Sequence, residues 1–270
     1  MDNAKLHTAY TLTLPVVVLA ILQSAAGLFL PALYRDIPLI VAAMKGNDVV
    51  TLFLVVPLLI WAATASRQGS QRAQLVWMGC LGYMVYNYLY YLFGVAFNRF
   101  FLIYTATFVC SFYAFIYGLS GIEIHKIAQK FKVKTPVRWI SGFLLFIGGI
   151  LFMVEMGQIL GFLWNAELPP SIIQFGDMDA PAIIFAADLS LVIPAFALAG
   201  IWLWQRRSWG FLLAAIMLVK AFAYGAALIG MVLFGWTTLG AWDALMPFYI
   251  FIAVGGFVFL LLFLKNLEEK

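Results

Sequence analysis

The sequence contains little charge. Only 10% of its 270 residues are Asp, Glu, Lys or Arg, whereas 65% are hydrophobic. A soluble domain does not need so much apolar surface, so this composition argues against a soluble protein and favours one that crosses a membrane several times. No segment is long and polar enough to fold separately. We therefore expect residues 1–270 to form a single all-α transmembrane domain.

Cysteine and histidine are scarce, with two of each. Cys80 and Cys110 fall inside predicted spans at different depths, which argues against a disulfide. His7 and His125 stand alone in polar flanks, which argues against a metal site. The chain also lacks a G-x-S-x-G, H-E-x-x-H, P-loop or paired-aspartate motif, and it has no histidine at bilayer depth to ligate haem. We expect no metal and no cofactor, and these absences leave open whether the protein is an enzyme.

Long apolar runs, by contrast, fill the chain. A transmembrane helix needs about 20 mostly apolar residues. The first run is too long for a signal peptide, contains Gln23 and Pro31, and lacks a small-residue cleavage site, so we expect it to be retained as a helix. About eight transmembrane helices are predicted, near residues 12–34, 48–65, 73–96, 99–121, 137–164, 181–204, 208–234 and 244–265.

The basic residues gather on one side of this predicted topology. With eight spans, both termini share a side with the connections at 66–72, 122–136 and 205–207. The opposite side carries only Arg35, Lys45 and Arg99. Because cytoplasmic loops are enriched in Lys and Arg, we expect a plasma-membrane protein with both termini in the cytoplasm. The basic charge is then a topology signal, and we expect no nucleic-acid partner. The basic residues assigned to the cytoplasmic side are Lys5, Arg67, Arg72, Lys126, Lys130, Lys132, Lys134, Arg138, Arg206, Arg207, Lys265 and Lys270.

The connection at 122–136 is amphipathic. In a helix, Ile124, Ile127, Ala128 and Phe131 share one face, with lysines on the other. One interpretation is a short helix that lies on the anionic inner leaflet, with membrane lipids as its partners. The other is an ordinary cytoplasmic connection whose charges only set the topology.

A weak internal repeat suggests two parallel four-helix halves, at 1–121 and 137–265. Leu54-Val55-Val56-Pro57 is echoed by Leu191-Val192-Ile193-Pro194, and a basic turn follows each segment. Gly27-Leu28-Phe29 is echoed in the same order by Gly161-Phe162-Leu163. An even number of spans in each half would give both halves the same orientation. The alternative is a chance resemblance between apolar helices.

Ionisable residues inside the predicted spans are the strongest functional signal. Asp188 and Lys220 lie on consecutive antiparallel helices, where an ion pair would offset part of the cost of burying each charge. Glu155 adds a second carboxyl that one lysine does not neutralise. The predicted depths place Gln23, Asn87, Glu155, Gln158 and Asp188 in the outer half of the bilayer, with Lys220 deeper. We therefore predict a ligand-binding or ion-coupling pocket lined by Gln23, Tyr83, Asn87, Glu155, Gln158, Asp188, Lys220 and Tyr224.

Three functions are compatible with such a pocket. The first is a transporter or binding protein for a small or amphipathic ligand. The second is an intramembrane enzyme for a lipid-like substrate, with a carboxyl as general acid or base. No nucleophile or metal ligand stands out, and the catalytic residues of such an enzyme remain unassigned. The third is a non-catalytic membrane subunit or sensor, in which the charges form a structural ion pair. The first explains the outer-half location of the polar residues best.

Overall fold

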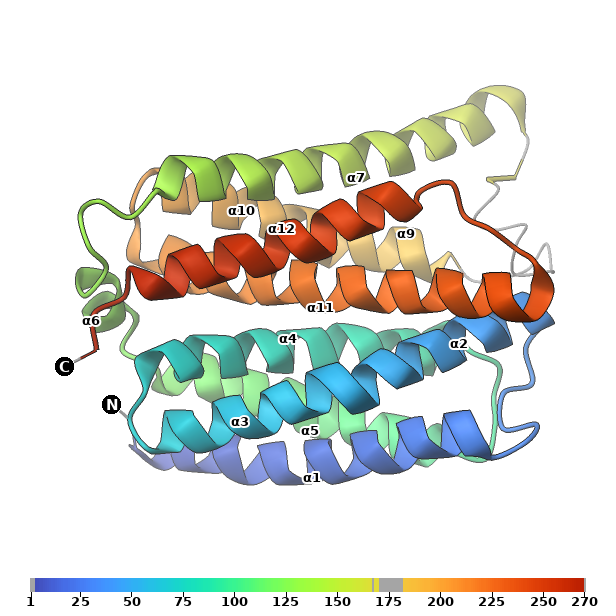
Figure 1. Cartoon of the computed structure of the whole chain (residues 1–270), viewed down its shortest axis with the longest axis horizontal. Coiled ribbons are helices and arrows are strands. Elements are labelled where there is room, and N and C mark those ends of the chain that lie inside the picture. Colours follow the sequence, from blue (N-terminus) through green and yellow to red (C-terminus); the bar gives the residue numbers. More distant parts are fainter. Residues whose placement is uncertain (1–2, 167, 170–181, 270) are drawn as a thin grey trace.

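The long helices of the computed structural model run side by side and form one bundle (Figure 1). The model describes residues 3–166, 168–169 and 182–269, and this part of the chain contains helices and no strand. The first half comprises α1 (Asn3–Phe29), α2 (Pro38–Val50), η1 (Thr51–Val55), α3 (Val56–Arg67), α4 (Gln71–Phe93) and α5 (Phe101–Gly121). The short α6 (Ile124–Gln129) follows. The second half comprises α7 (Val137–Asn165), α9 (Ile183–Ala187), η2 (Asp188–Val192), α10 (Ile193–Trp204), α11 (Ser208–Leu239) and α12 (Met246–Lys265).

Seven helices are long and apolar enough to cross a membrane, which supports a multi-pass membrane protein. The expected eighth span is not confirmed, because α4 is long but is not among the seven. Glutamines, an asparagine and several tyrosines reduce its apolar character, and most of its residues are buried by neighbouring helices. A helix that contacts protein instead of lipid can carry polar side chains that find partners. The seven spans are Ala4–Phe29, Pro38–Arg67, Phe101–Gly121, Val137–Asn165, Ile183–Trp204, Ser208–Leu239 and Met246–Lys265.

The second span of each half contains a π-helical segment. In the first half, η1 directly precedes Val56 and Pro57, and in the second, η2 directly precedes Ile193 and Pro194. Proline has no N–H to donate, and its ring clashes with the carbonyl four residues earlier in an α-helix. A wider π turn immediately before the proline accommodates both effects. Each span therefore continues through its proline without a break.

The two halves meet where α11 packs on α2 and α4 (Figure 1). In the lower half of the figure, α1 packs along α5, and α4 packs on both α3 and α5. In the upper half, α10 lies between α7 and α11, and α11 also packs on α12. The halves approach closely at Gly46 of α2 and Gly230 of α11, because a Cβ on either glycine would collide with the backbone of the other helix. The two groups thus form one continuous bundle.

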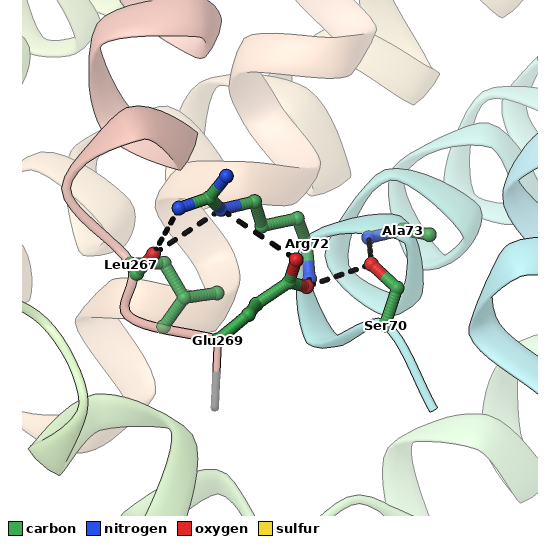
Figure 2. Close-up of polar contacts among 5 residues, drawn as sticks. All are labelled: Ser70, Arg72, Ala73, Leu267 and Glu269. Carbon is green, nitrogen blue, oxygen red and sulfur yellow. Dashed lines mark hydrogen bonds and ion pairs between the residues drawn. The ribbon is translucent and has the colours of Figure 1, made fainter. Parts of the chain in front are cut away.

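Both ends of the described chain lie at the same end of the bundle as α6 (Figure 1). The segment after α12 is fastened there to the start of α4. The Arg72 guanidinium donates to the Leu267 carbonyl at 2.5 Å, and the Ser70 hydroxyl donates to Glu269 Oε1 at 2.7 Å (Figure 2). The Arg72 backbone N–H also donates to Glu269 Oε1, at 2.8 Å. Partial burial raises the pKa of Glu269, but these donors and the Arg72 charge outweigh it and hold the pKa below its usual value.

The apolar face of the 122–136 connection packs against the helix bundle, whereas one interpretation expected it to face lipid. Ile124, Ile127 and Phe131 are all buried within the protein. The Phe131 ring lies 4.7 Å from that of Phe211 in α11 and 4.5 Å from that of Phe263 in α12, measured between ring centroids. Burial against these helices satisfies the apolar face, so it is not available to lipid.

Two helix boundaries differ from the sequence prediction in ways that matter for the site. The second helix begins at Pro38, ten residues before the predicted start of 48–65, because proline is well suited to the first turn of a helix. Asp48 is therefore well inside a helix and not at its outer end. The first helix ends at Phe29 and not near residue 34, so Tyr34 lies in the following turn, where it is buried.

Candidate functional site

Buried polar side chains form two clusters, and the central helix α4 contributes to both. Tyr83, Asn87 and Tyr91 are spaced four residues apart and share one face of α4. Their hydrogen bonds all reach side chains of the first half. Tyr86 lies on another face and bonds to the second half. Helix α4 thus separates the two clusters.

The first cluster, here called the Asp48 cluster, surrounds a fully buried carboxylate with hydrogen-bond donors. Asp48 Oδ1 accepts from Gln23 Nε2 at 2.8 Å and from the Tyr91 hydroxyl at 2.7 Å. Asp48 Oδ2 accepts from the Tyr34 hydroxyl at 2.5 Å. Three donors suit the ionised carboxylate, since they replace the water that burial removes. The members of the cluster are Gln23, Tyr34, Asn47, Asp48, Tyr83, Asn87, Tyr88 and Tyr91.

A second tier of hydrogen bonds holds those donors in place. The Tyr88 hydroxyl donates to Gln23 Oε1 at 2.9 Å, which orients the Gln23 amide toward Asp48. Asn47 Nδ2 donates to Asn87 Oδ1 at 2.9 Å and to the Tyr91 hydroxyl at 3.0 Å. The Asp48 cluster therefore ties α1, α2 and α4 together.

Gly27 of α1 makes room for the buried carboxylate. A Cβ at this position would collide with Asp48 Oδ2 and with the Tyr34 hydroxyl. The helix α1 can approach Asp48 closely only because residue 27 has no side chain.

The second cluster, here called the Asp188 cluster, consists of Tyr86, Glu155, Asp188, Lys220 and Tyr224. The Tyr86 hydroxyl donates to Asp188 Oδ1 at 2.7 Å. Lys220 Nζ lies over the aromatic rings, 3.5 Å from the Tyr86 centroid and 4.4 Å from the Tyr224 centroid. The two rings meet edge to face, with centroids 5.1 Å apart and planes at 87°. The ammonium is therefore held by cation–π contacts.

The ion pair predicted between Asp188 and Lys220, at salt-bridge or one-water distance, is not confirmed as a direct contact. The ion pairs found at 4.0 Å or less between described residues do not include it. Tyr86 instead joins the two, with its hydroxyl on Asp188 and its ring on Lys220. A tyrosine can do this because its polar tip and its ring face offer separate contacts. The sequence pattern could not identify Tyr86, because it is one tyrosine among several in α4.

Glu155 brings a second carboxyl to this cluster from α7. It lies beside Asp188, close enough for the two carboxyl groups to interact. Glu155 Oε2 is buried and has no hydrogen-bond partner within the described part of the chain. It is also the only buried residue in the outer half of α7, residues 149–165. The half of α7 that lies away from the termini therefore presents one buried residue to the bundle, and that residue is a carboxyl.

The close approach of α4 and α11 also shapes the Asp188 cluster. A Cβ on Gly79 would collide with the side chain of Val219, the residue before Lys220. Because Gly79 has no side chain, α11 lies near enough for Lys220 to reach the ring of Tyr86.

The structure assigns seven of the eight predicted site residues to the two clusters. Gln23, Tyr83 and Asn87 belong to the Asp48 cluster, so they do not line one pocket together with Asp188. Gln158 is half-buried, one helical turn from Glu155 on α7. The remaining four predicted residues, Glu155, Asp188, Lys220 and Tyr224, gather around Tyr86.

Sequence reasoning missed the centre of the first cluster. Asp48 and Asn47 were at or outside the predicted outer end of a span, and Tyr34 was at the end of the first one. The signal that could have found them is Pro38, which favours a helix start ten residues before Asp48. Tyr88 and Tyr91 belong to an aromatic segment in which spacing does not show which ring faces a polar partner.

Neither cluster resembles a metal centre. Among residues 3–166, 168–169 and 182–269, no three His, Cys, Asp or Glu side chains gather into a group that could hold a metal ion. No protein-family model, curated protein or solved structure matches this chain.

Proposed function

We propose that this protein is a membrane transporter or membrane ligand-binding protein whose ionisable site is the Asp188 cluster. One observation carries the proposal: three ionisable side chains from three spans are buried together around Tyr86. Ionisable residues at bilayer depth are costly and typically mark ion or substrate pathways.

The charges of the Asp188 cluster do not balance. With every group ionised, two carboxylates face one ammonium, which leaves one negative charge in excess. A buried uncompensated charge is strongly unfavourable, so the cluster favours binding one more cation or one proton. A site that gains and loses one positive charge is suited to ion-coupled transport.

The Asp48 cluster supports a different role. Its carboxylate already accepts three hydrogen bonds, and its neighbours bond to one another. A buried carboxylate held by three donors, which are themselves held by further hydrogen bonds, makes a rigid frame. The first half then serves as the fixed part against which the Asp188 cluster operates.

We further propose that α4 is the eighth span and that the end carrying the termini is cytoplasmic. Helix α4 lies alongside the seven apolar helices over their length (Figure 1). The basic turns at 66–72 and 205–207 lie at the same end as both termini (Figure 1), which agrees with the positive-inside rule. The protein would then reside in the plasma membrane with an even number of spans.

We also infer that the halves are duplicated units. Helix α3 begins at Val56 and α10 at Ile193, and the π segments before them begin at Thr51 and Asp188. Helices α4 and α11 begin at residues 71 and 208. Each start is 137 residues later in the second half.

This offset of 137 residues makes Asp188 correspond to Thr51, and Lys220 to Tyr83. The hydroxyls of Thr51 and Tyr83 lie 3.5 Å apart. The first half therefore holds a neutral pair where the second half holds the two charged residues.

Proteoliposomes that enclose a pH-sensitive dye would test the proposed function. A panel of alkylamines, alkyl carboxylates and amino acids would be added one at a time. We expect at least one solute to cause a pH change in wild-type vesicles, and none to do so with the double variant Asp188→Asn, Lys220→Met. The double variant removes one charge of each sign and leaves the net charge of the cluster unchanged, so it should fold.

The variant Thr51→Val is the matched control, since it alters the neutral position that corresponds to Asp188. It should retain the pH change. A folded double variant that still moves protons with a solute would refute the proposal. A folded wild type that responds to no solute would favour the non-catalytic subunit.

A further inference from the structure

The contacts of Lys220 indicate which kind of ligand the Asp188 cluster accepts. Its ammonium lies over the faces of Tyr86 and Tyr224, which stand nearly perpendicular to each other. Two such ring faces around one cation form an aromatic cage, the arrangement that proteins use to bind organic ammonium ions. Lys220 is therefore a tethered alkylammonium in a site shaped for that group.

The carboxyl groups beside the cage have room for one more positive charge. Glu155 Oε2 has no donor among the described residues, and its polar neighbour is the Asp188 carboxyl. Two carboxylates cannot hydrogen-bond to each other, whereas a shared proton or a bound ammonium would join them. The titratable groups around Glu155 are Asp188 from η2 and, beyond it, Tyr86 from α4 with Lys220 and Tyr224 from α11.

Packing becomes looser from this cluster toward the outer end of α7. On the face that carries Glu155, Gly148 is buried, Ile159 is half-buried, and Phe162 is 40% exposed.

From these observations we propose that the Asp188 cluster binds an organic ammonium ion, in exchange for a proton shared by Glu155 and Asp188. The incoming ammonium takes the place of the Lys220 ammonium over the two rings, and the displaced Lys220 ammonium turns toward Asp188. The two carboxylates, now without their shared proton, balance the two ammonium charges. This inference rests on the proposed function and names its ligand class. A hard metal ion would instead require a shell of oxygen ligands, which the ring faces do not provide.

Chemical rescue of a lysine variant tests the proposal. Lys220→Ala should leave an alkyl-sized cavity beside the two rings and the carboxyls. Propylammonium added to the purified variant should raise its unfolding temperature, whereas propanol, which is neutral and of similar size, should have a much smaller effect. Wild-type protein should bind propylammonium more weakly by about tenfold or more, because Lys220 competes for the cage.

Two further variants separate charge recognition from cavity filling. Met217→Ala opens a cavity one helical turn away on α11, at a buried apolar position. It should respond to propanol and propylammonium alike. Adding Tyr86→Leu to Lys220→Ala should remove the preference for propylammonium.

The release of protons provides an independent readout. In weakly buffered solution, propylammonium should release protons from the wild type, and the variant Glu155→Gln should release fewer. Equal rescue of Lys220→Ala by propanol and propylammonium, or no rescue by either, would overturn the proposed ligand class. Proton-coupled flux of an anionic solute in proteoliposomes would support the proposed transport function but refute an ammonium ion as the ligand. Binding of ammonium without flux would support the ammonium class and refute transport.

Discussion

At the scale of single residues, Tyr86 determines how the charges of the second cluster are arranged. Its hydroxyl bonds to Asp188 and its ring carries the Lys220 ammonium. The acid and the base are thereby stabilised separately and do not neutralise each other by direct contact. Both remain available for exchange with a ligand or a proton.

The two contacts of Tyr86 can be measured separately. Tyr86→Phe keeps the ring and removes the hydrogen bond to a carboxylate, which should cost about 1.5–3 kcal/mol of unfolding free energy. Tyr86→Leu also removes the ring face and should cost about 2 kcal/mol more. Denaturant titration of the detergent-solubilised protein measures both. The exposed Tyr117→Phe is the control and should be neutral. Equal losses for the two Tyr86 variants would show that the ring does not stabilise Lys220.

Gly27 offers a test of the Asp48 cluster. Gly27→Ala places a methyl group against Asp48 Oδ2 and the Tyr34 hydroxyl, and overpacking of this kind costs about 1–3 kcal/mol. Gly149→Ala is the matched control, because its added Cβ meets open space. Thermal unfolding should show a loss for position 27 only. A stable Gly27→Ala variant would mean that α1 can move away from Asp48 without cost.

At the scale of helices, glycines determine where the halves touch and π segments determine which residues face inward. The start of η2 at Asp188 directs its carboxyl toward Tyr86 of α4. The contact of Gly46 with Gly230 brings α2 against α11. The arrangement of the bundle therefore depends on a few small residues as well as on its apolar surfaces.

The glycine contact between the halves predicts non-additive mutations. Gly46→Ala and Gly230→Ala should each destabilise the protein by about 1–3 kcal/mol, because each added Cβ meets the opposing backbone. Once one alanine has separated the helices, the second should add less than its own cost, since both act on one contact. Unfolding curves of the two single variants and the double variant measure this coupling. Full additivity would indicate that the two glycines act independently.

At the scale of the whole molecule, the end of the bundle that carries the termini is also the end that joins the halves. The segment 266–269 contacts the start of α4 in the first half and the 130–132 connection. Its hydrogen bonds with Arg72 and Ser70 link the last helix of the second half to the first half (Figure 2). A few polar contacts thus join the two halves at this end of the bundle.

The proposed orientation can be tested with reporters. A reporter fused after Lys270 should be cytoplasmic, as should one inserted at 68–69. Reporters inserted at 240–245 or at 165–181 should lie on the opposite side of the membrane, because an odd number of spans separates each of these connections from either terminus. Accessibility to a membrane-impermeant label distinguishes the two sides. Labelling of residues 270 and 240–245 from the same side would refute eight spans.

The contact of the C-terminal segment should depend on pH. The folded pKa of Glu269 is lowered, so its stabilising contribution is present above the ordinary glutamate range and is lost as the pH falls through the folded value. A fluorophore on Glu268→Cys, in a protein without Cys80 and Cys110, should show decreasing anisotropy over that range. Glu269→Gln should give low, pH-independent anisotropy, whereas Glu123→Gln should behave like the parent. Constant anisotropy in the parent would contradict the prediction.

The sequence by itself determined that the chain is a multi-pass membrane protein. It also located seven of the spans, most of whose ends were predicted to within a few residues. It further indicated that Glu155, Asp188 and Lys220 occupy buried positions. Apolar run length and the cost of buried charge are local properties, so they can be predicted without knowledge of neighbours. Only the tertiary structure decided which polar residues meet. The Pro38 start places Asp48 within the bundle, and side-chain direction on α4 assigns Tyr83 and Tyr86 to different clusters. Such contacts depend on how helices rotate and pack against one another, which spacing within one helix does not specify.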